Sequence, residues 1–270
     1  MIWPRANAAW FTGILGGLRA RHLEPVRSNA LQAHPGAVPF RVCGSVSHAL
    51  VAFNARDAGC SALLYAAGIN AFGELGNGTT DRARRGENVL EMHGIEHIAA
   101  GNGFTLVAAR DGLYGCGTTA RGQLGIQGRD TLLSMTQIPL PRPAARITDL
   151  SAGMDHVLLL QDASVFATGL NTDGQLAKPA VIPYATQFTH VALPEGVLPT
   201  RVIAGGDTSM VLTSSGNVFV WGNTEYGQAL QAATVDQLRT PTEVDVGISV
   251  VDACLGGSFL LFLDAMAEQA

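Results

Sequence analysis

Residues 202–230 read VIAGGDTSMVLTSSGNVFVWGNTEYGQAL and contain the unit from which most of the chain is built. Three short apolar runs, 202–204, 209–213 and 218–221, are separated by turns rich in glycine, serine and asparagine. Apolar runs of this length between turn residues are typical of β-strands that follow one another in sequence. The stretch therefore predicts an antiparallel meander of short strands.

The second half of this stretch occurs four times, so the chain contains internal repeats. The copies are LYAAGINAFGELGNG from 64, LYGCGTTARGQLGIQ from 113, VFATGLNTDGQLAKP from 165 and VFVWGNTEYGQALQA from 218. The steps between them are 49, 52 and 53 residues. Eight glycines at matching places are expected in turns that need positive φ or a close backbone approach near the axis: Gly68, Gly73, Gly117, Gly122, Gly169, Gly174, Gly222 and Gly227. Glycine runs that recur in meanders and open no long helix are not expected to cradle a phosphate.

The first half of the stretch occurs five times. Its copies are VCGSVSHALVAF from 42, AAGNGFTLVAAR from 99, SAGMDHVLLLQD from 151, IAGGDTSMVLTS from 203 and CLGGSFLLFLDA from 254. A unit of about 50 residues made of short strands cannot bury both faces of its sheet alone, so neighbouring units must stack. The repeats predict an all-β protein, a β-propeller of about four to five blades over residues 42–270 whose fifth blade is incomplete.

The order of residues within one unit is that of a known repeat. AG-x-x-H, an apolar strand, a polar turn and V-x-x-W/T-G-x-N-x-x-G-Q-L resemble the repeat of the regulator of chromosome condensation family, over about residues 42–265. The resemblance implies a β-propeller. Because the namesake of the family is a guanine-nucleotide exchange factor, it also implies action on a small GTPase as one function. Family propellers usually have more blades, so either the N-terminal arm closes the ring or a partner covers an exposed sheet edge.

Residues 1–41 differ from the rest of the chain in charge. This N-terminal arm has five arginines and one glutamate, whereas residues 42–270 have 12 basic and 21 acidic residues. An arginine-bearing, acid-poor start resembles a mitochondrial transit peptide, which predicts a mitochondrial location; a cytoplasmic or nuclear location is the alternative. Cys43, Cys60, Cys116 and Cys254 form no CxxC pair. No apolar stretch approaches the ~20 residues that span a bilayer.

The sequence predicts no catalytic residue, no cofactor-binding residue and no metal ligand. His48 and His156 occupy the same place in their repeats, where a hydrogen bond to a neighbouring turn is the expected role. His93 and His97 are four residues apart, but Gly94 between them and the strand pattern do not place both rings on one helical face. We therefore expect a protein that is not an enzyme and needs no cofactor.

Two functions fit a propeller without a catalytic group. The first is a scaffold or assembly subunit of a larger complex, such as a mitochondrial ribonucleoprotein, and the alternative is a guanine-nucleotide exchange factor for a small GTPase. The stretch NGTTDRARRGEN at 77–88 is expected to be a loop in which Arg82, Arg84 and Arg85 contact a protein partner or RNA. The acidic body argues against general binding of a polyanion, so any RNA contact would be local, through the arm or this loop.

Overall fold

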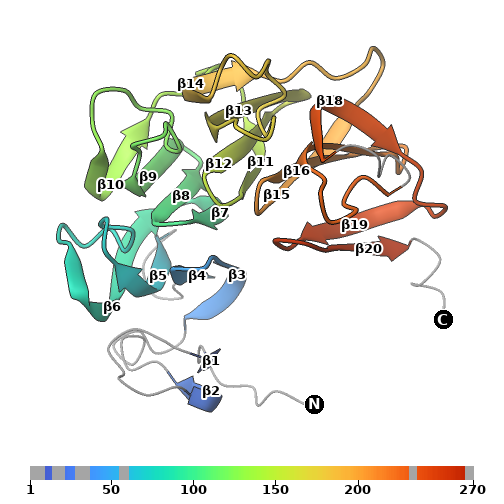
Figure 1. Cartoon of the computed structure of the whole chain (residues 1–270). Coiled ribbons are helices and arrows are strands. Elements are labelled where there is room, and N and C mark those ends of the chain that lie inside the picture. Colours follow the sequence, from blue (N-terminus) through green and yellow to red (C-terminus); the bar gives the residue numbers. More distant parts are fainter. Residues whose placement is uncertain (1–9, 14–21, 28–36, 55–60, 231–235, 265–270) are drawn as a thin grey trace. The chain divides into compact units, whose positions relative to one another are not determined.

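The computed structural model describes residues 10–13, 22–27, 37–54, 61–230 and 236–264, and all regular structure in them is β-strand (Figure 1). The chain divides into two compact units, which are described separately. The first is Met1–Thr118 with Thr131–Gln137, and the second is Thr119–Asp130 with Ile138–Ala270.

The first unit contains a hairpin and two four-stranded sheets. The hairpin pairs β1 (Trp10–Gly13) with β2 (His22–Arg27). The first sheet follows chain order: β3 (Val38–Gly44), β4 (His48–Asn54), β5 (Ser61–Asn70) and β6 (Asp81–His93). The second also follows chain order: β7 (Ile95–Gly101), β8 (Phe104–Ala109), β9 (Gly112–Thr118) and β10 (Thr131–Ile138).

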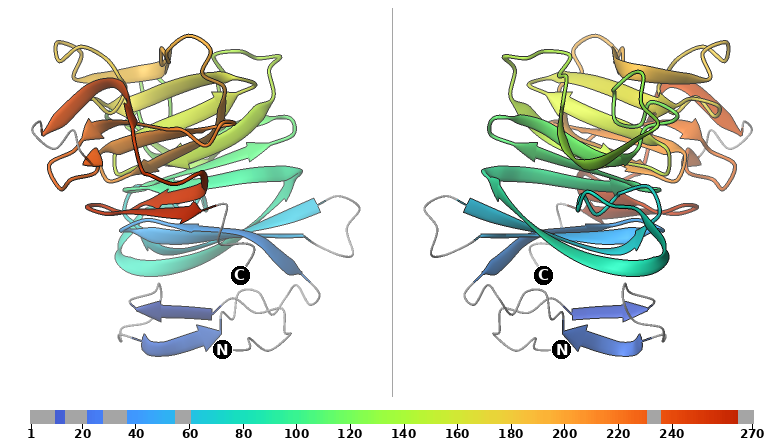
Figure 2. Two further views of the ribbon diagram at one scale, coloured as in Figure 1. Left: turned by 90° about the vertical axis from the view of Figure 1, so that its right-hand side faces the viewer. Right: turned by 90° about the vertical axis from the view of Figure 1, so that its left-hand side faces the viewer.

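The second unit contains two more meanders and a shorter one. One sheet has β11 (Ile147–Ala152), β12 (His156–Gln161), β13 (Ser164–Leu170) and β14 (Tyr184–His190). The next has β15 (Pro199–Gly205), β16 (Thr208–Thr213), β17 (Val218–Asn223) and β18 (Gln237–Val244). The last, red in both views of Figure 2, has only β19 (Val250–Leu255) and β20 (Leu260–Asp264).

These sheets confirm the predicted fold class. All strand pairs are antiparallel, and each repeat supplies one small sheet, as expected for propeller blades. Apart from the β1–β2 hairpin, the described sheets are four complete blades and one partial blade. Each complete blade has a fourth, outer strand in addition to the three that the apolar runs predict.

Neighbouring blades within a unit are held together by alternate residues of their second strands. In β16, Val211 packs with Trp221 and Leu158 toward one neighbour, whereas Met210 and Leu212 pack toward the partial blade. Because successive side chains of a strand point to opposite faces, one strand serves two interfaces. Such a strand is covered on both faces, and β8, β12 and β16 are buried at every position.

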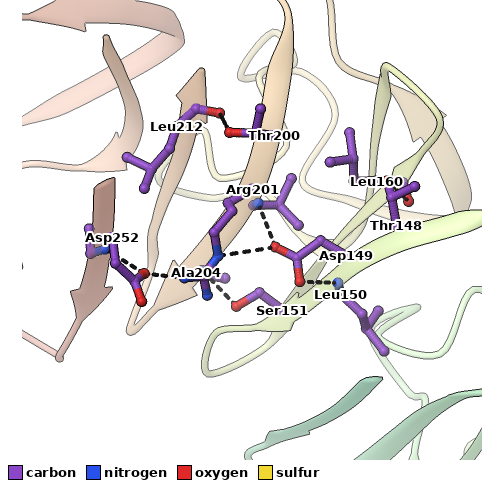
Figure 3. Close-up of polar contacts among 12 residues, drawn as sticks. Thr148, Asp149, Leu150, Ser151, Leu160, Thr200, Arg201, Ala204, Leu212 and Asp252 are labelled. Atoms are coloured by element: carbon purple, nitrogen blue, oxygen red, sulfur yellow. Dashed lines mark hydrogen bonds and ion pairs between the residues drawn. The ribbon is translucent and has the colours of Figure 1, made fainter. Parts of the chain in front are cut away.

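The innermost strands of the second unit are also linked by polar side chains (Figure 3). Asp149 Oδ2 accepts a hydrogen bond from the Val202 amide at 3.0 Å, and Ser151 Oγ accepts one from the Ala204 amide at 2.9 Å. Arg201 is paired with Asp149, with its Nε 3.7 Å from Oδ2, and also with Asp252. Since β15 is an edge strand, these side chains satisfy amides that its own sheet leaves unpaired.

The first glycine of each repeat lies where the third strand passes the turn before the second strand. All eight repeat glycines have φ between 80° and 143°. At Gly117, a Cβ would lie 2.2 Å from the carbonyl oxygen of Gly103 in the same sheet. The positive φ and the close backbone approach at this glycine are therefore as predicted, and the approaching backbone is a neighbouring strand end of the same blade.

His48 and His156 are buried and hydrogen-bonded to the next blade. His48 Nε2 lies 2.6 Å from Thr105 Oγ1, and His156 Nε2 lies 2.9 Å from Ser209 Oγ. Both hydroxyls donate their only proton to a backbone carbonyl, of Glu74 and Gln175, so each histidine must donate from Nε2. Burial lowers the pKa of both histidines to about 4. The partner in the next blade is thus a side chain on a strand, and His48 also makes the expected hydrogen bond to a turn, with its Nδ1 2.8 Å from Ser47 Oγ.

Candidate partner-binding face

In the second unit, the loop of one blade is joined to the turn of the next by a glutamine and an aspartate. Gln123 Nε2 donates to Asp155 Oδ1 at 3.0 Å, and Gln175 Nε2 donates to Asp207 Oδ1 at 2.9 Å. The glutamine Oε1 accepts a backbone amide two residues earlier, at Arg121 for Gln123. Each glutamine is therefore fully oriented, and the loop ends are fixed in place.

These loops and turns carry both charged and apolar side chains and form what we call the turn face: Arg121, Met154, Asp155, Asp173, Asp207 and Tyr226. Arg121 Nη1 lies 2.8 Å from Asp155 Oδ2. Burial raises the pKa of Asp207, and the nearby carboxylates of Asp173 and Asp155 raise it further, against the hydrogen bond from Gln175. Met154 and Tyr226 are 40% and 63% exposed. Fixed carboxylates beside exposed apolar groups suit contact with a protein surface.

The glutamine–aspartate pair is missing at two of the junctions between successive repeats. Glu74 stands where the other blades have glutamine, and Gly103 stands opposite in place of aspartate. Glu74 is fully buried, and its Oε1 has no hydrogen-bond partner among the described residues. In the last repeat, Ser258 replaces the aspartate, and Gln228 Nε2 likewise has no partner in the described part of the chain.

Replacing Glu74 by glutamine is expected to stabilise the protein by about 1 kcal/mol at pH 7. Burial raises the pKa of Glu74, so the folded state is penalised when this carboxylate is ionised. A glutamine keeps the acceptor for the Phe72 amide, which Glu74 Oε2 now provides at 2.7 Å, without the buried charge. Urea unfolding of wild type and E74Q at pH 7 and pH 4 measures the effect. The gain should shrink at pH 4, and an equal gain at both pH values would contradict this explanation.

For the arginines predicted to contact a partner, the structure describes the backbone but not the side chains. The backbone of residues 81–88 belongs to β6, so the loop prediction for 77–88 was wrong from Asp81 onward. Ile69 of β5 pairs with Arg85, and the register shifts so that Asn70 pairs with Asp81. The side chains of Arg82, Arg84 and Arg85 lie outside the described residues, and their contact with a protein or RNA stays a prediction. A charged segment can form a strand here because β6 is an edge strand.

The turn face was missed by the sequence analysis. Asp155 was assigned no role there, whereas the structure buries its side chain to 8% exposure. A signal was present, because glutamine recurs at 123, 175 and 228 while aspartate recurs at 155 and 207. Among the described residues, no group of His, Cys, Asp and Glu side chains suits a metal ion.

Comparisons with known proteins identify the repeat. The regulator of chromosome condensation (RCC1) repeat matches residues 201–228. The bovine secretion-regulating guanine nucleotide exchange factor is 30% identical over 247 residues, which are 85% of this chain and 51% of that protein. The chain belongs to the regulator of chromosome condensation repeat family. It spans about half the length of the curated relatives it matches.

Two solved structures have the same fold. Human WBSCR16 superposes with a TM-score of 0.75 at 20% identity, over 92% of this chain and 65% of that one. Yeast Prp20p, studied for its binding to Gsp1p and histones, gives 0.73 at 17% identity, over 92% and 61%. No helix among the described residues has the length and apolar character needed to cross a bilayer.

Proposed function

We propose that this chain binds a small GTPase through the turn face and promotes release of its guanine nucleotide. The observation that carries the proposal is the 30% identity to a guanine nucleotide exchange factor over 85% of the chain. The turn face supports it because its loops are fixed by the hydrogen bonds of Gln123 and Gln175 before any partner arrives. A surface that is ordered in advance loses little conformational entropy on binding.

Exchange of this kind requires binding and no covalent chemistry by the propeller. A factor that weakens the grip of a GTPase on its nucleotide must, by linkage, bind the nucleotide-free GTPase more tightly than the loaded one. Arg121 and the carboxylates of Asp173 and Asp207 offer both signs of charge to the GTPase, whereas Asp155 is buried and orients Arg121. Exchange was the alternative in the sequence analysis, which favoured a scaffold, and the identity to an exchange factor supports it as the first candidate.

The second candidate is a scaffold that holds partners without exchange. It is favoured by the partial blade, where Val251, Leu261 and Leu263 are 44%, 60% and 45% exposed. Met210 and Leu212, which occupy the positions of Leu261 and Leu263 in β16, are buried. Apolar groups on a sheet of two strands suit burial against another chain. The mitochondrial location and the RNA contact predicted for the N-terminal arm stay proposals.

The two candidates differ in how they bind a panel of recombinant small GTPases. An exchange factor should bind at least one member tenfold or more tightly in the nucleotide-free than in the GDP-loaded form. Surface plasmon resonance with the full chain and each form of the GTPase gives the two dissociation constants and hence their ratio. A ratio near one for every GTPase that binds would favour the scaffold, and no binding would contradict the proposed exchange role.

A further inference from the structure

The loop between β13 and β14 has an exposed apolar tip. Val181 is 85% exposed, Ile182 is 40% exposed, and Tyr184 at the start of β14 is 49% exposed. Lys178 carries the only charge between Ala177 and Tyr184, and its Nζ donates to the His190 carbonyl at 2.6 Å. The tip therefore presents methyl groups to solvent and has no free cation for a phosphate.

This loop is held in shape from within. Asn171 is fully buried, and its Nδ2 donates to the carbonyls of Ile182 at 2.7 Å and Lys178 at 3.2 Å. The Asn171 amide donates to the Pro183 carbonyl at 2.8 Å, and the Ile182 amide donates to the Pro179 carbonyl at 3.0 Å. Two prolines further restrict the backbone. The apolar tip is thus displayed on an ordered loop.

The hydrogen bonds from a buried asparagine, which we call the brace, also occur in another blade, where they support a loop with a polar tip. Asn70, which corresponds to Asn171, donates to Asn77 Oδ1 at 3.1 Å and to the Thr79 carbonyl at 3.0 Å. That loop exposes only asparagine, glycine and threonine over 77–80. The brace is therefore a general feature of the repeat, whereas exposed valine and isoleucine are not needed to fold such a loop. Keeping apolar groups in water on an ordered loop is unfavourable unless a partner covers them.

We propose that Val181 and Ile182 are the apolar anchor of the GTPase interface and enter a concave apolar patch on that partner. The inference rests on the proposed function and adds a specific contact. The loop starts at Asn171 and passes through Asp173 of the turn face, so one partner can reach both. Apolar anchors on ordered elements carry much of the binding energy at protein interfaces because little conformational entropy is lost on docking.

The test compares three full-length proteins in the binding assay with nucleotide-free GTPases: wild type, the double variant V181S/I182S and the control L198S. Leu198 is 59% exposed in the loop before β15, so the control also removes an exposed apolar side chain of the second unit. We expect V181S/I182S to weaken binding at least tenfold with an unchanged melting temperature. We expect L198S to bind like wild type.

The outcomes separate this inference from the proposed function. If wild type binds a GTPase and V181S/I182S binds it equally well, the anchor is wrong and the proposed function stands. Equal losses in V181S/I182S and L198S would also overturn the anchor, because the effect would then be general. If wild type binds no GTPase of the panel, both proposals are wrong.

Discussion

Gly122→Ala is expected to destabilise the second unit by about 4 kcal/mol, among the largest effects of a single substitution in this chain. A Cβ at Gly122 would lie 2.1 Å from the Ala185 carbonyl oxygen and 2.7 Å from Thr186 Cα. Both contacts are with the backbone of β14, the outer strand of the next blade, which cannot move without opening its sheet. The φ of 80° adds a further penalty for any residue with a Cβ.

The repeat supplies a matched control in Gly227→Ala. Gly227 occupies the same place in its repeat and has a φ of 82°, but no described atom lies within 4 Å of its ideal Cβ. Only the backbone penalty of about 1–2 kcal/mol should remain. Urea unfolding of both variants at pH 7 measures the difference. Equal losses of stability would show that φ alone, and not the neighbouring strand, requires glycine here.

Acidification from pH 7 to pH 4 is expected to cost about 3 kcal/mol of stability for each of His48 and His156. The pKa of both falls from 6.5 in the unfolded chain to about 4 in the fold because burial disfavours the charged ring. Between these pH values the unfolded state binds more protons, so the stability that is fully present above pH 6.5 is lost as the pH falls. Carboxylates also titrate in this range, so the histidines must be isolated by substitution.

His156→Phe provides that comparison, because Phe104 occupies the same place in the repeat of β8. The Ser209 hydroxyl keeps its hydrogen bond to the Gln175 carbonyl in this variant. The free energies of unfolding at pH 7, 5.5 and 4 give the slope of stability against pH for each protein. We expect a shallower slope in H156F than in wild type, and parallel slopes would show that His156 does not titrate as its burial requires.

The sequence predicted the inner three strands of each blade but not the outer one. Runs such as 209–213 are largely apolar because both faces of β16 are covered and every position is buried. Outer strands have one unpaired edge and one solvent-exposed face, so they tolerate many polar residues. Accordingly, β18 reads QLRTPTEV and β6 begins DRARRGEN. Their polar composition is that of a loop. Only pairing with the third strand makes them strands, and pairs such as Leu170 with Tyr184, 14 residues apart, are not visible in local composition.

The candidate site was less predictable than the fold. Glycines can be read from the sequence because a turn allows few other residues at positive φ. The role of Asp155 depends instead on Gln123 and Arg121, 32 and 34 residues away, which stacking brings to its carboxylate. The apolar tip at Val181 was equally hidden, since an isolated Ala-Val-Ile run between prolines gives no sign of whether it is buried.

Release of a fluorescent GDP analogue from the small GTPases that bind the full chain tests the central claim most directly. Release rates are measured with excess unlabelled GDP, with and without the protein, and with the R121A variant as a probe of the turn face. We predict that wild type accelerates release from at least one GTPase tenfold or more, and that R121A accelerates it less while keeping its melting temperature. Unchanged release from every GTPase that binds would contradict the exchange function.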